Sequence, residues 1–255
     1  NILPLICIPS TSGTGAEVTW CAVITDTERQ YKMTVGDPVH MIPVLAICDP
    51  EITIGLPKSL TAACGVDALT HCIEAYTVQL HQPITDALAL KGISMIAENL
   101  EKAYENGEDR EARRNMMIAS TIGGMAFISS NVGAVHAFAE TVGAWFDTPH
   151  GVACAMMLPI VMEYNADCTG EKYREIARAM GVEGVDAMSQ EEYRKAAVAA
   201  VRKLSEDVGI PSKLEAIKES DLDFLAESAH ADACAPGNPK DASVEDLKEL
   251  FRKIM

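Results

Sequence analysis

The sequence has no cluster or stripe of basic residues. Its 255 residues include 21 Lys and Arg against 37 Asp and Glu, which gives a formal net charge of -16. Nucleic acids and anionic membrane surfaces attract clustered Lys and Arg. Aromatic residues are also scarce, at 5%, so stacking platforms for single-stranded nucleic acid are not expected. We therefore expect no nucleic acid and no membrane among the partners.

Long apolar runs are missing as well. The longest uninterrupted run, Val152 to Met162, has 11 residues, whereas a helix needs about 20 to cross a bilayer. We expect this segment to form a buried helix instead. With 48% hydrophobic residues, the chain can bury a sizeable core in one or two domains.

The cysteines show no Cys-x-x-Cys pair and no regular spacing. They are Cys7, Cys21, Cys48, Cys64, Cys72, Cys154, Cys168 and Cys234. This pattern indicates neither a disulfide framework nor a zinc ribbon. We expect reduced thiols that pack as small apolar residues, and, with no signal peptide, a cytoplasmic location.

The distribution of short and long apolar patterns divides the chain at residue 54. Short segments rich in Val, Ile and Thr predict strands at 2–8, 18–25, 31–36 and 44–48. After residue 54, apolar residues at i, i+3 and i+4 predict helices at 58–80, 84–106, 109–127, 151–168, 189–208, 221–231 and 243–254. The predicted fold is an α/β remnant, 1–54, followed by an all-helical domain, 55–255.

Four side chains form a candidate metal site: Asp67, His71, His136 and His150. Asp67 and His71 are four residues apart in a predicted helix, so they share one face and can bind the same cation. Imidazole nitrogens with one carboxylate suit Fe(II), zinc or other late first-row ions better than calcium or magnesium. Cys64 and Cys72 flank this pair and stay open as alternative ligands, because zinc favours thiolates.

Several segments resemble the iron-containing alcohol dehydrogenases. The matches are residues 61–78 and 148–165, the Ser/Thr/Gly segment 8–19, and the shorter segments 48–51, 83–89 and 237–240. Together they extend over essentially the whole chain. The resemblance implies that Asp67, His71, His136 and His150 are the metal ligands, with iron as the metal and zinc as the alternative.

The resemblance also implies an NAD or NADP cofactor. Thr11, Ser12, Gly13, Thr14 and Gly15 match the family's nucleotide-contacting segment, which usually has Ser where this chain has Ala16. Lys32 matches a lysine near the nicotinamide ribose, although a solvated strand lysine is an equal interpretation. In the family, a dinucleotide-binding domain with a Gly-Gly-Gly-Ser loop precedes this point. Because the chain begins at Asn1 and has no such loop, we expect a fragment.

Two positions depart from the family pattern. Glu140 stands where the family commonly has a histidine suspected of relaying a proton, so Glu140 is the candidate proton-transfer residue. The ordinary carboxyl pKa near 4.3 must be raised for this role near neutrality. Ile160 also replaces a histidine found in many relatives, which removes a hydrogen-bonding group near the site.

Two functions stay open. In the first, the chain is most of a metal-dependent dehydrogenase that transfers a hydride between NAD(P) and a small alcohol or aldehyde, working as a dimer or larger homo-oligomer as is usual in the family. In the second, it is a stand-alone divalent-metal-binding helical module, either structural or hydrolytic. Residues 10–19 favour the first, since a pure metal module has no use for a nucleotide-contacting segment.

Overall fold

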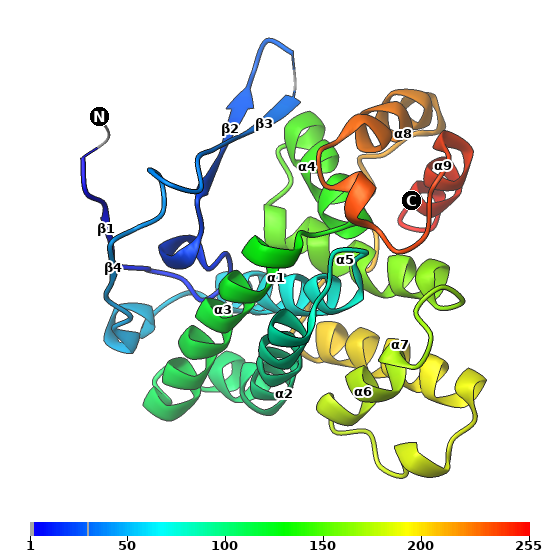
Figure 1. Cartoon of the computed structure of the whole chain (residues 1–255). Helices are drawn as coiled ribbons and strands as arrows, with labels where there is room; N and C mark the ends of the chain where they lie inside the picture. Colours follow the sequence, from blue (N-terminus) through cyan, green and yellow to red (C-terminus); the bar gives the residue numbers. More distant parts are fainter. Residues whose placement is uncertain (1–2, 30) are drawn as a thin grey trace.

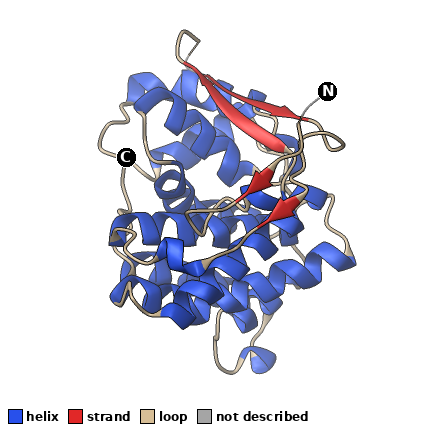
Figure 2. Cartoon of the chain, turned by 90° about the vertical axis from the view of Figure 1, so that its left-hand side faces the viewer, coloured by secondary structure: helices blue, strands red, loops and turns tan. Residues whose placement is uncertain are grey.

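The computed structural model describes residues 3–29 and 31–255. The described chain is mainly helical, with its strands gathered on one side (Figures 1 and 2). The strands are β1 (Ile6–Cys7), β2 (Cys21–Asp26), β3 (Tyr31–Gly36) and β4 (Leu45–Ala46). The helices are α1 (Lys58–Thr77), α2 (Pro83–Glu105), α3 (Arg110–Ser130), α4 (Ala134–Phe146), α5 (His150–Asn165), α6 (Lys172–Ala179), α7 (Gln190–Asp207), α8 (Leu222–Ala231) and α9 (Val244–Arg252).

The strands form two separate pairs. β1 and β4 are parallel, with Ile6 opposite Leu45, and β2 and β3 form an antiparallel hairpin, with Cys21 opposite Gly36. The strand predicted at 2–8 is shorter than expected, because β1 pairs only with two residues of β4; its residue 2 lies outside the described residues. The strand predicted at 18–25 starts late, since Ala16–Val18 forms a short 3₁₀ helix.

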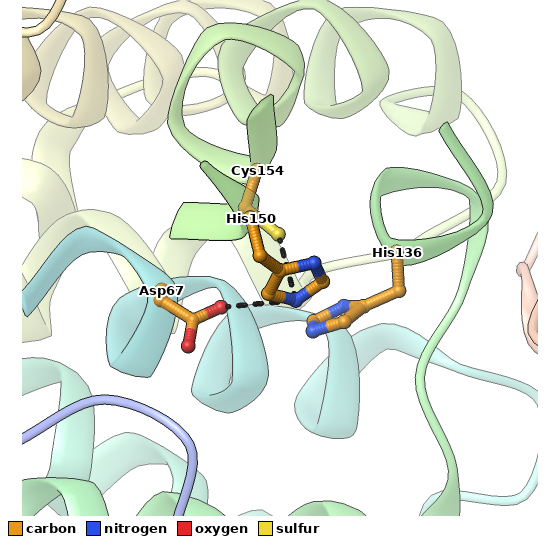
Figure 3. A group of neighbouring side chains, drawn as sticks. All are labelled: Asp67, His136, His150 and Cys154. Atoms are coloured by element: carbon orange, nitrogen blue, oxygen red, sulfur yellow. Dashed lines mark hydrogen bonds and ion pairs between the residues drawn. The ribbon is translucent and has the colours of Figure 1, made fainter. Parts of the chain in front are cut away.

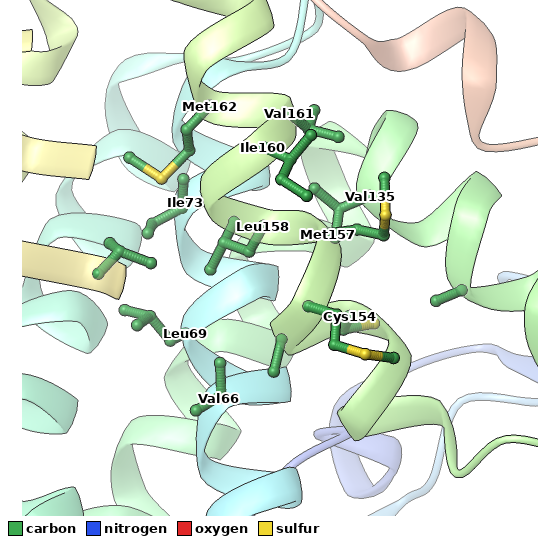
Figure 4. Packing of buried hydrophobic residues seen from close by; sticks show 14 of the residues in the cluster. Val66, Leu69, Ile73, Val135, Cys154, Met157, Leu158, Ile160, Val161 and Met162 are labelled. Atoms are coloured by element: carbon green, nitrogen blue, oxygen red, sulfur yellow. The ribbon is translucent and has the colours of Figure 1, made fainter. Parts of the chain in front are cut away.

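Helix α1 lies at the centre of the helical region. From Thr61 to Thr77 every residue except Cys64 is buried, and the helix packs against α2, α3 and α5. A helix buried on all sides shows no single apolar stripe, and the buried surface of α1 also includes the polar residues Asp67, His71 and Glu74. In Figure 4, Leu69 and Ile73 of α1 lie in the same packed cluster as Met157 and Leu158 of α5. This packing fixes α1 and α5 relative to each other.

The seven predicted helices are confirmed, with ends shifted by up to three residues. Two helices were missed, α4 and α6. Helix α4 has no capping side chain of its own, because Gly133 occupies the N-cap position. The first amides of α4 instead donate hydrogen bonds to distant side chains: Ala134 N to Asn238 Oδ1 and Val135 N to Glu74 Oε1. The sequence near residue 134 therefore carries no local start signal.

No single helix in the described part of the chain is long and apolar enough to cross a membrane. Only α3 and α4 taken together reach the required length and composition, and they are bent by 105°.

The division of the chain into two domains at residue 54 stays a prediction.

Candidate metal centre and adjoining cleft

Three acidic or imidazole side chains of α1 lie on one face of that helix. Asp67, His71 and Glu74 occupy positions i, i+4 and i+7, which lie above one another along a helix. All three are buried, and Asp67 is only 2% exposed. Neighbouring elements must supply partners for three such buried groups.

The partners come from the starts of α4 and α5. His136 is the third residue of α4, and its Nε2 lies 3.0 Å from Nε2 of His71. His150 is the first residue of α5, and its Nε2 lies 3.5 Å from Oδ1 of Asp67 (Figure 3). The structure thus brings together the four residues predicted as ligands.

The close approach of α5 to α1 depends on Gly151. A Cβ atom at this position would lie 2.3 Å from the carbonyl oxygen of Ala63. Glycine, which has no Cβ, therefore allows the start of α5 to touch α1 and places His150 beside Asp67.

Several polar atoms at this site have no hydrogen-bond partner. Among the described residues, buried atoms of this kind include Asp67 Oδ1, His71 Nδ1 and His150 Nδ1. A buried polar atom without a partner costs about 1–3 kcal/mol, so a cluster of them indicates a missing ligand. Three imidazoles and one carboxylate form a donor set that fits Fe(II) or zinc.

The imidazole pKa values support metal binding. Burial, followed by the charges of His136 and His150, lowers the pKa of His71 well below its ordinary value. Burial also lowers the pKa of His150 to about 4. Both rings are therefore neutral near pH 7 and keep the lone pair that a metal ligand requires.

His136 differs from the other two imidazoles. Burial alone would lower its pKa, but the carboxylate of Glu74, with smaller contributions from Asp67 and Glu140, raises it overall. Glu74 Oε2 lies 2.5 Å from Nδ1 of His136. This contact holds a proton on Nδ1 and directs Nε2 toward His71. A carboxylate behind a ligating histidine in this way is common in metal sites.

Two residues at the site, Glu74 and Cys154, were not predicted from the sequence. Glu74 could have been found from its spacing of seven residues from Asp67. Cys154 follows His150 by four residues in α5, and its Sγ lies 3.6 Å from Nε2 of His150. One donor atom each from Asp67, His136, His150 and Cys154 lie within 4.8 Å of one another. The alternative ligand Cys72 faces a different region, where its Sγ fills the space beside Gly92 and Gly123.

A cleft of about 840 Å³ opens beside the metal centre. Its walls include His71, His136 and His150 together with side chains of the hairpin and of α3. Of the predicted cofactor-binding residues, Thr14 and Lys32 line this cleft. Ser12 and Gly13 are buried instead, and Gly13 packs against Cys64 of α1.

Gly15 holds the cofactor segment close to α3. Its φ of 62° lies in the left-handed region, and a Cβ atom there would lie 2.7 Å from Cα of Gly124. The structure therefore gives Gly13 and Gly15 packing roles, while Thr11 to Gly15 as nucleotide contacts stay a prediction.

Glu140 connects the hairpin with the metal centre. Its Oε2 lies 3.6 Å from Nζ of Lys32, and its Oε1 lies 3.7 Å from Nδ1 of His150. Burial raises the pKa of Glu140, although Lys32 acts in the opposite direction. A raised pKa is what a carboxyl group needs to transfer protons near neutral pH.

The other histidines make contacts elsewhere. His40 Nδ1 lies 2.9 Å from Oδ2 of Asp37, His81 Nδ1 lies 3.0 Å from Oδ2 of Asp86, and His230 Nδ1 lies 3.1 Å from the Ala242 carbonyl oxygen. These contacts agree with their exclusion from the predicted ligand set.

Comparison with known proteins gives one consistent result. The sequence model of the Fe-containing alcohol dehydrogenase family, C-terminal, matches residues 61–255, and that of iron-containing alcohol dehydrogenase matches residues 1–50. The chain is 47% identical to lactaldehyde reductase of Escherichia coli (strain K12) over 251 residues, which are 98% of this chain and 65% of that protein. It is 41% identical to 1,3-propanediol dehydrogenase of Klebsiella pneumoniae over 252 residues, again 98% of this chain and 65% of that protein.

Solved protein structures agree with the sequence comparisons. The crystal structure of a 1,3-propanediol oxidoreductase superposes with a TM-score of 0.96 at 40% identity, covering 100% of this chain and 67% of that one. An alcohol dehydrogenase from Oenococcus oeni gives a TM-score of 0.95, also at 40% identity and with the same coverage. This chain thus spans about 65% of the length of the curated relatives that it matches. From the matched residues, the identities and the shared fold, the chain belongs to the iron-containing alcohol dehydrogenase family.

Proposed function

We propose that this chain supplies the metal centre and part of the cofactor cleft of an NAD(P)-dependent alcohol dehydrogenase, or aldehyde reductase, that acts on a small alcohol or aldehyde. The observation that carries the proposal is the convergence of Asp67, His71, His136 and His150, with buried donor atoms that lack partners and with the three histidines at the wall of the cleft. Family membership supports this function over a stand-alone metal-binding module.

The chemistry depends on two groups that the protein would bind. Fe(II), or zinc as the alternative, supplies a Lewis acid for the substrate oxygen, and NAD or NADP supplies the hydride carrier. Asp67, His71, His136 and His150 would hold the metal ion. Thr11, Ser12, Gly13, Thr14, Gly15 and Lys32 would contribute to the cofactor site.

Residues of the cleft would transfer the proton and exclude water. Glu140, buried between Lys32 and His150, would hold the proton that moves to or from the substrate oxygen. Trp20 and Phe127 line the same cleft and would keep water away from the reacting carbon. The cleft volume, about 840 Å³, lies within the range of small-molecule binding sites.

We further propose a cytoplasmic location and a homo-oligomeric assembly, as expected from the sequence. The names of the relatives suggest lactaldehyde and 1,3-propanediol as first substrates to assay.

The experiment is a titration of the anaerobically iron-loaded chain with NADH and NADPH, monitored by nicotinamide fluorescence. Saturable binding followed by reduction of lactaldehyde supports the proposal. About one metal ion per chain without binding of either cofactor would show that these residues hold the metal but not the cofactor, and would contradict the proposed cofactor contribution of Thr11 to Gly15 and Lys32. The matched control is the chain prepared without metal.

A further inference from the structure

Cys154 lies in the metal centre, where the family resemblance assigns no ligand. It follows His150 by one helical turn on α5, so the two side chains share a face. Cys154 is fully buried, with 0% exposure. Its Sγ lies 3.6 Å from Nε2 of His150, and Figure 3 shows it beside the ring of His150.

The sulfur belongs to a compact donor set. One atom each from Asp67, His136, His150 and Cys154 lie within 4.8 Å of one another, and these residues come from three helices. His71 does not belong to this tightest group, and its ring stacks on Phe127 with centroids 4.4 Å apart. Cys154 is thus placed to approach an ion held by Asp67, His136 and His150.

A second observation indicates that this donor set binds a cation. Asp67 Oδ1 is buried and has no hydrogen-bond partner, and its nearest ion-pair contact is the 3.5 Å approach of His150 Nε2. A buried carboxylate oxygen without a partner is unfavourable unless a positive charge lies beside it. A divalent ion would provide that charge.

We propose that Cys154 binds the metal as a thiolate in addition to Asp67, His71, His136 and His150, and that it shifts the preference of the site from Fe(II) toward zinc. The inference rests on the proposed metal centre. When the ion binds, a metal–sulfur bond forms, the S–H bond breaks, and the proton leaves to solvent without any change of oxidation state. Thiolates favour zinc over harder divalent ions.

Cobalt substitution tests the proposal directly. Co(II) bound by a thiolate shows an intense near-ultraviolet charge-transfer band that nitrogen and oxygen ligands do not produce. The wild-type chain loaded with Co(II) should show this band, and Cys154→Ser should lose it while still binding Co(II). The matched control is Cys72→Ser, which changes another fully buried thiol, placed between α1, α2 and α3, and should keep the band.

The outcomes separate the two proposals. Co(II) that binds to the wild type without the band would overturn the role of Cys154 and leave the metal centre intact. A chain that binds no Co(II) would overturn both. A band that survives in Cys154→Ser and disappears in Cys234→Ser would assign the thiolate to Cys234, which also lines the cleft, and so would overturn the proposal.

Two measurements extend the test. X-ray absorption of the zinc-loaded wild type needs no variant and should show a zinc–sulfur distance of about 2.3 Å; scattering from nitrogen and oxygen alone would contradict the proposal. Competition with a chelator should show that Cys154→Ser weakens zinc binding on the order of 100-fold, because the thiolate supplies a substantial share of the zinc-binding free energy. Fe(II) binding should change less, and equal losses for both metals would refute the shift in preference.

Discussion

Glu74 Oε2 lies 2.5 Å from Nδ1 of His136, although the two residues are 62 positions apart in the sequence. The other oxygen of the same carboxylate accepts a hydrogen bond from the backbone of Val135, at 2.8 Å. Glu74 therefore holds both the imidazole and the first turn of α4. One side chain of α1 determines where a ligand from another helix is placed.

Glu74→Gln should weaken metal binding by about 10- to 100-fold, the usual effect of losing a carboxylate behind a ligating histidine. An amide can still accept from Val135 N, so the fold should be kept. The measurement is chelator competition with Fe(II) or zinc, with circular dichroism to check folding. Glu98→Gln on the exposed face of α2 is the control. Equal affinities in all three proteins would show that Glu74 does not position His136.

Glu140→Gln should slow turnover by about 100-fold or more in an active enzyme, because general acid–base groups contribute at least this much. Metal content should not change. Burial raises the pKa of Glu140, so the pH–rate profile of the wild type should contain a limb above the ordinary carboxyl value of about 4.3, and the variant should lack it. The control is Glu227→Gln, an exposed position on α8. Superimposable profiles would exclude Glu140 from proton transfer.

Gly151→Ala should disturb the metal centre through packing. The added Cβ would meet the Ala63 carbonyl oxygen at 2.3 Å, so α5 must move away from α1. We expect a loss of about 1–3 kcal/mol in the free energy of unfolding together with weaker metal binding, since His150 moves with α5. Denaturant unfolding and metal titration measure the two effects. A stable variant with normal metal affinity would show that this close contact is not required.

Tyr173→Phe tests how the free energy of unfolding depends on pH, at a residue away from the metal centre. The hydroxyl donates a 2.8 Å hydrogen bond to the Met162 carbonyl oxygen, and its loss should cost about 1 kcal/mol near neutral pH. Burial raises the pKa of Tyr173 above its ordinary value near 10.

The sign of the effect follows from proton release. Above about pH 10, the unfolded chain loses a phenol proton that the native state keeps, so Tyr173 contributes a loss of stability as the pH rises, and the variant lacks this contribution. The difference between the two proteins should therefore shrink at alkaline pH. Denaturant unfolding near pH 8 and pH 11 measures it, with Tyr31→Phe in the hairpin as the control. If the difference in unfolding free energy between the wild type and the variant stays constant with pH, the raised pKa of Tyr173 is contradicted.

Much of the site could be predicted from the sequence because α1 carries it on one face. The spacing of Asp67 and His71 within a long helical pattern identified both the helix and the pair. The position of His136 and His150 beside Asp67 and His71 could not be predicted from sequence spacing, because it depends on the packing of α4 and α5 against α1. Only the resemblance to a known family supplied these two residues.

The parts that escaped prediction share a physical cause. Helix α4 starts at amides that bond to Glu74 and Asn238, which are remote in the sequence. Cys154 lies in a run of apolar residues, where a buried cysteine ordinarily serves only for packing. In both cases the information lies in tertiary contacts and not in the local pattern.

The measurement that tests the account most directly is the metal content of the anaerobically iron-loaded chain and of its His136→Ala and His150→Ala variants, determined by elemental analysis. His230→Ala, which removes a histidine on α8 away from the cluster, is the control. We expect about one metal ion per chain in the wild type and in the control, with a large loss of metal in both ligand variants. Unchanged metal content in either ligand variant would contradict the metal centre described here.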